Sequence, residues 1–191
     1  MINLFKNNIL FMMMHLIIIS NLNGQINIYS HRHYDSDKIL FKKFTEKTGI
    51  EVNVVKGSAD QLIERLINEG ENSPADILLT VDAGRLYRAK IANILEPVKS
   101  PILKNNIPYN FRDPENYWFG FSVRARVFVY SKDRVKPSEL STYEDLANSK
   151  WKGRIVVRSS SNIYNQSLMS SIIEANGSKE AHKWAKAIRG N

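Results

Sequence analysis

Strand-like and helix-like segments alternate along most of this chain, and that alternation constrains its fold more than any other feature. Strand-like runs rich in branched apolar residues begin at Ile26, at Ile50 and directly after Asp76, and a helical pattern of apolar residues follows each of them. Strands joined by helical crossovers are typical of a largely parallel sheet with helices on both faces. The sequence therefore predicts an α/β fold.

The expected helices have recognisable start signals. Asp35 or Ser36 can cap the first helix, Ser58 with Gln61 forms a capping box before the second, and Asp82 can cap the third. Each of these side chains can accept a hydrogen bond from an amide that the first helical turn leaves without a partner. The apolar positions expected to face the sheet are, in the first two helices, Ile39, Leu40, Phe44, Leu62, Ile63, Leu66 and Ile67.

The second half of the chain predicts a less regular arrangement. Residues 96–116 contain four prolines and are expected to form an irregular connection. Residues 117–130 form a long extended segment with a central glycine, which suits a chain passing from one lobe to another, and residues 154–158 predict a strand. Two helices are expected to follow, at about residues 163–175 and 179–189, with Gly177 between them.

A single further strand cannot form an independently stable sheet, so we expect the second lobe to be incomplete in this chain. The expected organisation is a signal peptide over residues 1–24, a first lobe over 25–122, a hinge-crossing strand over 123–131 and a partial second lobe over 132–191.

The first residues have the composition of a secretory signal peptide. Lys6 precedes an apolar stretch from Ile9 to Ile19, and small and polar residues up to Gly24 follow it. The stretch is short for a membrane span, although an uncleaved anchor is the alternative interpretation. The chain has no cysteine, so an exported protein of this sequence depends on core packing and not on disulfides. We expect a mature protein that is not inserted in the membrane.

The formal net charge is +8, which on its own is compatible with nucleic acid, an anionic ligand or an acidic partner. The basic residues are scattered along the chain, and no run of like charge and no RNA-binding aromatic motif is present. Export also argues against nucleic acid. Solvated surface charge is the interpretation that these observations favour.

Tyr34 and Tyr164 each occur where an expected strand gives way to an expected helix. In open α/β sheets this junction is where ligands bind. A phenol is an unusual group for an anion site, but a phenolate oxygen suits a hard and highly charged metal ion, because hard cations prefer oxygen ligands. The two tyrosines are therefore the first candidates for a metal site.

Several motifs resemble the periplasmic ferric-iron-binding proteins of ABC transporters. They are Arg32-His33-Tyr34, the run from Thr80 to Leu86, the run from Gly120 to Tyr130, the run from Thr142 to Leu146, and Trp151-Lys152-Gly153-Arg154. The resemblance implies a two-lobed periplasmic-binding-protein type II fold that closes around Fe³⁺. It also implies a soluble, monomeric periplasmic protein that is not an enzyme and that hands iron to an ABC transporter permease.

The resemblance also implies roles for individual residues. Tyr34 and Tyr164 match phenolate ligands from the two lobes, His33 matches a ligand in some members, and Arg124 matches a basic residue near the metal. An adjacent pair of tyrosines normally follows further along in the family. Because no such pair occurs here, we expect residues 25–191 alone to hold iron weakly or not at all.

The chemistry of Fe³⁺ fits this ligand set. A free tyrosine titrates near pH 10, and a bound cation removes the proton from its ligand. Arg124 is a permanent cation that can balance surplus negative charge. Ligands divided between two lobes would also link metal binding to hinge closure, because the closed form gains bonds that the open form lacks.

Other interpretations remain open. Each tyrosine could simply pack at the start of a helix, and His31 with His33 has the spacing of a two-histidine metal pair. The same fold could bind an anion or a polyamine, since Ser159, Ser160 and Ser161 could cradle an anion beside a helix start. A secreted enzyme is a third possibility, but common catalytic motifs are missing, and Asp35 and Asp82 are more easily explained as helix caps.

Overall fold

The computed structural model describes residues 24–191, which divide into two compact units between Val81 and Asp82. The predicted signal peptide, residues 1–24, lies almost wholly outside the described residues. Among residues 24–191, no helix is both long and apolar enough to cross a membrane. The predicted lobe boundaries, including a first lobe over residues 25–122, stay predictions.

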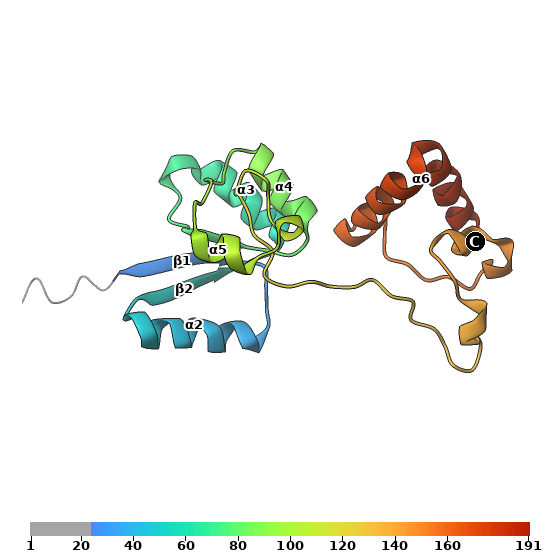
Figure 1. Ribbon diagram of the computed structural model, residues 1–191, viewed down its shortest axis with the longest axis horizontal. Coiled ribbons are helices and arrows are strands. Elements are labelled where there is room, and N and C mark those ends of the chain that lie inside the picture. The colour runs from blue at the N-terminus through green and yellow to red at the C-terminus, as the bar shows by residue number, and fades with distance from the viewer. Residues whose placement is uncertain (1–23) are drawn as a thin grey trace, which may run out of the picture. The chain divides into compact units, whose positions relative to one another are not determined.

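The first unit contains a parallel three-stranded sheet, as the strand–helix alternation predicts. Its strands are β1 (Gln25–Ser30), β2 (Glu51–Lys56) and β3 (Ile77–Leu79), and their order is β2-β1-β3 (Figure 1). Ile28 of β1 lies opposite Val54 of β2 and Ile77 of β3. The strand that comes first in the sequence is therefore central. The helix α2 connects it to β2, and α3 connects β2 to β3 on the other side of β1.

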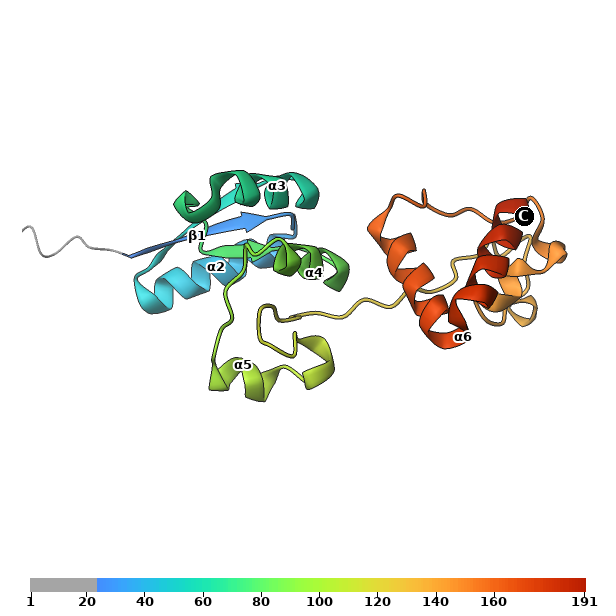
Figure 2. The same cartoon turned by 90° about the horizontal axis from the view of Figure 1, so that it is seen from above.

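The helices α2 (Asp35–Thr48) and α3 (Ala59–Glu69) lie on opposite faces of this sheet (Figures 1 and 2). The predicted capping box of α3 is present, because Ser58 Oγ accepts from the amide of Gln61 and the Gln61 side chain accepts from the amide of Ser58. Burial of Leu62, Ile63 and Leu66 against β1 forms the core of the unit. A short 3₁₀ turn, η1 (Gly70–Asn72), ends this helix.

The helix α2 differs from its prediction in its contacts. Ile39 and Leu40, expected to face the sheet, remain 58% and 63% exposed, and no residue of α2 is buried. The helix ends as predicted at Gly49, whose left-handed φ of 72° allows its amide to bond to the carbonyl of Thr45.

The second unit is mainly helical, and Ile107, Trp151, Ile163 and Ile172 are among its buried residues. Its helices and 3₁₀ turns are α4 (Ala83–Ile91), α5 (Pro101–Asn106), η2 (Tyr109–Phe111), η3 (Pro137–Glu139), η4 (Glu144–Ala147), η5 (Ser149–Trp151) and α6 (Ile163–Gly190). The prediction of an irregular connection over residues 96–116 is therefore partly wrong. Ser100 caps α5 and a proline occupies its first position, which together favour a short helix.

A lysine at the end of α4 holds the loop that follows α5. Lys90 Nζ lies 2.9 Å from the buried carboxylate of Asp113 and also donates to Glu115. Where this loop turns back, Gly120 donates to the carbonyl of Phe111, and a Cβ at residue 120 would lie 2.9 Å from that oxygen. Only glycine fits there without a shift of the loop.

Two predicted strands are not present. The described residues contain one isolated bridge, Arg112 with Phe119, along the segment 117–130, so the expected hinge-crossing strand at 123–131 is extended chain without a ladder. The predicted strand at 154–158 is also irregular. Strand-like residues become a strand only when another strand accepts and donates their backbone hydrogen bonds, and no described segment does this here.

The two helices predicted at the end of the chain are present as the halves of α6. They meet at Gly177, whose φ of 77° and ψ of 158° are not helical. Trp184 on the second half donates to the carbonyl of Tyr143, which fastens that half against η4.

Candidate metal-binding residues

Tyr34 stands between β1 and α2, as the sequence predicts. It is the last residue before the helix, with extended dihedral angles, and its carbonyl accepts the first helical hydrogen bond, from the amide of Asp37. Its side chain is 39% exposed. The junction therefore presents a phenol near the carboxyl end of the central strand, where a ligand could reach it.

The predicted cap of α2 is wrong. Neither Asp35 nor Ser36 caps the helix, because the N-cap position belongs to Tyr34, whose side chain makes no capping hydrogen bond. Asp35 instead pairs with Lys38 at 2.8 Å. A phenol at the N-cap therefore replaces the usual serine, threonine or aspartate cap, and the first turn of α2 lacks a side-chain cap bond.

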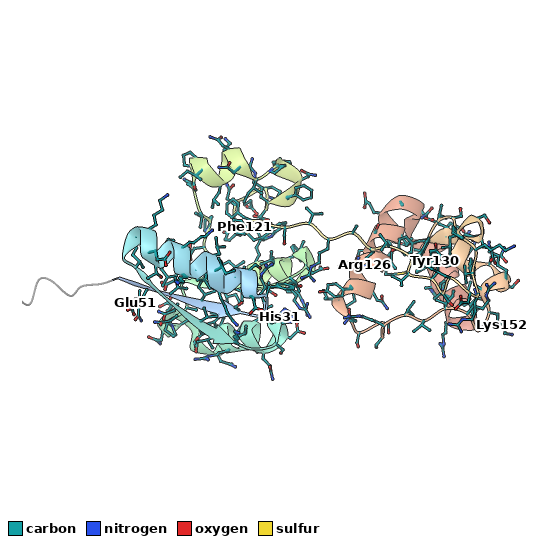
Figure 3. All side chains as sticks on the ribbon, turned by 90° about the horizontal axis from the view of Figure 1, so that it is seen from below. His31, Glu51, Phe121, Arg126, Tyr130 and Lys152 are labelled. Carbon is teal, nitrogen blue, oxygen red and sulfur yellow. The ribbon has the colours of Figure 1, made fainter. Side chains whose placement is uncertain are left out.

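Basic residues surround the phenol of Tyr34. The ring of His33 stacks on it with centroids 5.0 Å apart, and the guanidinium of Arg32 lies 5.0 Å from its centroid. Arg32 also donates two hydrogen bonds of 2.9 Å to the carboxylate of Asp37, and these bonds hold the pKa of that carboxyl below its usual value. His31, labelled in Figure 3, lies one residue past β1, where its amide continues the ladder by donating to Leu79.

Tyr164 lies in the first turn of α6, again as predicted. Asn162 caps the helix and accepts from the amide of Tyr164 at 3.0 Å. Arg124 Nη1 donates to the phenol oxygen of Tyr164 at 2.8 Å. The structure therefore brings the predicted basic residue Arg124 into direct contact with the predicted ligand Tyr164.

Two further arginines lie against Tyr164, and the sequence interpretation missed both. The guanidinium carbons of Arg126 and Arg158 are each 5.4 Å from the ring centroid. Figure 3 labels Arg126 on the extended segment beside α6. Alternation in an extended segment places Arg124 and Arg126 on one face, which could have predicted Arg126. No sequence signal predicts Arg158, since an irregular loop positions it.

An aspartate connects these groups. Asp82 caps α4 as predicted, accepting from the amide of Gly84, but it also accepts from Ser167 Oγ at 2.8 Å and lies 3.6 Å from Arg126. Ser167 is about one helical turn after Tyr164 in α6. The φ of Asp82 is 75°, which is uncommon for a residue other than glycine, although aspartate tolerates that region better than most residues. Because one carboxylate contacts α4, α6 and Arg126, it fixes the surroundings of Tyr164.

Within the described part of the chain, no group of three or more His, Cys, Asp or Glu side chains could hold a metal ion. Tyr34 and His33 are on the first unit and Tyr164 and Arg124 on the second, and each pair forms a local group.

Residues 72–191 match the family of bacterial extracellular solute-binding proteins. The chain belongs to this family. Its resemblance to the ferric-iron-binding members, seen in the sequence motifs, is also confirmed. Iron uptake protein A1 of Synechocystis is 55% identical over 167 residues, which make up 87% of this chain and 46% of that protein. The major ferric iron-binding protein of Neisseria meningitidis is 27% identical over 87% of this chain.

The solved structures agree with these sequence matches. The iron- and citrate-bound FutA of Trichodesmium has a TM-score of 0.84 and 61% identity, covering 88% of this chain and 53% of that one. The ferric binding protein of Campylobacter jejuni has a TM-score of 0.81 and 46% identity. These matches confirm the predicted α/β periplasmic-binding fold. The chain spans about half the length of the relatives it matches.

Proposed function

We propose that this protein captures ferric iron outside the cytoplasm and delivers it to the permease of an ABC importer. The observation that carries the proposal is the placement of Tyr34 and Tyr164, each at the start of a helix and each against basic side chains. Relatives of 55% and 31% identity, from Synechocystis and Serratia marcescens, are named an iron uptake protein and a Fe(3+)-binding periplasmic protein.

The chemistry supports iron as the cargo. Fe³⁺ is a hard cation that prefers oxygen ligands, and phenolates are strongly basic oxygen donors. Each phenolate adds one negative charge, which a trivalent ion tolerates and which Arg124 would help to balance. Tyr34 and Tyr164 would be ligands, His33 a third donor beside Tyr34, and Arg124 a charge partner outside the ligand set.

The role of the transporter follows from the same proposal. Ligands on different units would couple iron binding to closure of the protein, and a permease could distinguish the closed form from the open one. We propose that the mature protein acts as a monomer in the periplasm after removal of residues 1–24 and is not an enzyme. The relatives' names describe binding and uptake proteins.

Visible absorption tests the proposal directly. Ferric citrate added to the protein expressed from its whole gene should give a phenolate-to-iron charge-transfer band. Tyr164→Phe should weaken or shift that band, whereas Tyr87→Phe, on an exposed tyrosine of α4, should not change it. A protein that stays colourless, or a band that Tyr164→Phe leaves unchanged, would contradict the proposal.

Binding of an anion is the second candidate, and one observation favours it. Arg124, Arg126 and Arg158 together place three guanidiniums around Tyr164, which suits an anionic ligand. A putative 2-aminoethylphosphonate-binding protein of Salmonella typhimurium is 28% identical over 118 residues. Calorimetry with phosphate and with citrate, each without iron, distinguishes the two: anion binding as tight as that of ferric citrate favours the second candidate. The same arginines disfavour a polyamine, which is itself cationic.

A further inference from the structure

Each proposed ligand tyrosine has an arginine against its ring, and an aspartate holds that arginine. On the first unit the three residues are Tyr34, Arg32 and Asp37. On the second unit they are Tyr164, Arg126 and Asp82. We propose that Asp37 and Asp82 are positioning residues for the iron ligands, each acting through the arginine it holds. This inference rests on the proposed function.

The contacts on the first unit are tight. Both oxygens of Asp37 accept from Arg32 at 2.9 Å, and the two side chains are only 15% and 19% exposed. A bidentate pair of this kind fixes the plane of the guanidinium as well as its place. Holding a long arginine side chain on the ring costs rotamer freedom, and the two hydrogen bonds to Asp37 offset that cost. Asp37 therefore keeps a positive charge beside the phenol of Tyr34.

The contacts on the second unit are looser but more numerous. Asp82 lies 3.6 Å from Arg126, and Ser167 donates to both carboxylate oxygens, at 2.8 and 2.9 Å. Asp82 is therefore connected to Tyr164 in two ways. It pairs with Arg126, which lies against the ring of Tyr164, and it bonds to Ser167 of α6, the helix that contains Tyr164. Its φ of 75° shows that the backbone adopts an unfavourable conformation at the residue that makes these contacts.

The same arrangement also occurs at tyrosines that are not proposed ligands. Lys90, held by Asp113, lies 4.9 Å from the ring of Tyr117, and Arg65, held by Glu69, lies 4.7 Å from the ring of Tyr29. The arrangement by itself stiffens a tyrosine. What distinguishes Asp37 and Asp82 is that the tyrosines they stiffen stand at the two helix starts proposed to hold iron. Asp113 therefore provides a matched control.

The first test needs no metal. Hydroxyl-radical footprinting of the metal-free protein, read by peptide mass spectrometry, measures how well each ring is covered. Asp37→Asn should increase oxidation of Tyr34, Asp82→Asn that of Tyr164, and Asp113→Asn that of Tyr117. Asparagine keeps the size of the side chain and tolerates a positive φ, so these variants remove charge without forcing the backbone to move.

The second test measures iron release to a competing chelator. Outer partners of metal ligands typically change affinity by about tenfold or more, so Asp37→Asn and Asp82→Asn should each speed release by about tenfold. Asp113→Asn should leave the release rate unchanged. Ser167→Ala separates the two routes from Asp82, because it breaks the helix contact and keeps the ion pair with Arg126.

The outcomes separate this inference from the proposed function. A wild-type protein that never binds iron overturns the proposed function, and the role of the aspartates in iron binding falls with it, whatever the footprints show. Wild-type iron binding with unchanged oxidation of Tyr34 and Tyr164 in the variants overturns the inference alone. Increased oxidation with an unchanged release rate also overturns it, because the aspartates would then hold the rings without affecting the metal.

Discussion

At the scale of single residues, the sequence predicts the position of Tyr34 correctly and the cap of the helix that follows it wrongly. The motif Arg32-His33-Tyr34 predicts correctly that a phenol follows the first strand. The same sequence predicts Asp35 or Ser36 as the cap, and this is wrong because Asp35 pairs with Lys38. Several polar residues in one turn can each satisfy a capping pattern, and their other side-chain contacts decide between them. The pairing of Arg32 with Asp37 is one such contact that the pattern does not show.

Acid should remove the contribution of Asp37 to stability. Arg32 holds the pKa of Asp37 below its usual value, so its stabilising effect is full above the unfolded pKa and is lost as the pH falls through the folded one. The difference in unfolding free energy between wild type and Asp37→Asn should be constant above about pH 5 and shrink below about pH 4. Urea denaturation across pH measures it.

A neutral change in the same turn provides the control for this titration. Ser36→Ala removes an exposed hydroxyl two residues after Tyr34, and its effect on stability should not vary over the same pH range. A stability difference for Asp37→Asn that persists undiminished at pH 2 would contradict the assignment.

At the scale of elements, the capping box of the second helix and the first three strands are predicted correctly, and two later strands are not. The second helix was predicted with its capping box and its stop because both depend on neighbours in sequence. The strands expected over residues 123–131 and 154–158 are irregular because a strand depends on a partner that may be far along the chain. Local patterns do not predict the contact between Arg124 and Tyr164 for the same reason, since 40 residues separate the two.

The capping box of α3 should have a measurable energy. Ser58→Ala removes the acceptor for the amide of Gln61, and loss of such a cap costs about 1 kcal/mol of unfolding free energy. Thermal or urea unfolding followed by circular dichroism measures the change. Ser58→Asp, which can still accept from that amide, should restore most of the loss. Equal destabilisation by both variants would show that the cap bond is not the cause.

At the scale of the whole molecule, the two units each carry one proposed ligand tyrosine. The family resemblance implies that Tyr34 and Tyr164 come from different lobes, and the predicted lobe boundaries stay predictions. No periodicity or cap carries that expectation, since local patterns contain no information about which residues bind one ligand. Family resemblance supplied the part of the prediction that local physics could not.

In the proposed function Tyr34 and Tyr164 bind the same ion, and this proposal predicts coupled effects of substitutions at the two residues. Tyr34→Phe and Tyr164→Phe should each weaken iron binding, and the loss in the double variant should differ from the sum of the two by more than about 0.5 kcal/mol. Competition with a chelator of known iron affinity measures all three losses. Strict additivity would indicate that the two phenols serve separate sites.

The positive charge of the three guanidiniums around Tyr164 affects which chemical form of iron this protein would bind fastest. Like charges repel, so this corner of the second unit opposes the approach of a bare trivalent cation and attracts an anionic iron chelate. For a protein that takes up ferric iron, loading would then be fastest from a negatively charged complex in dilute buffer. Added salt would slow that delivery by screening the attraction.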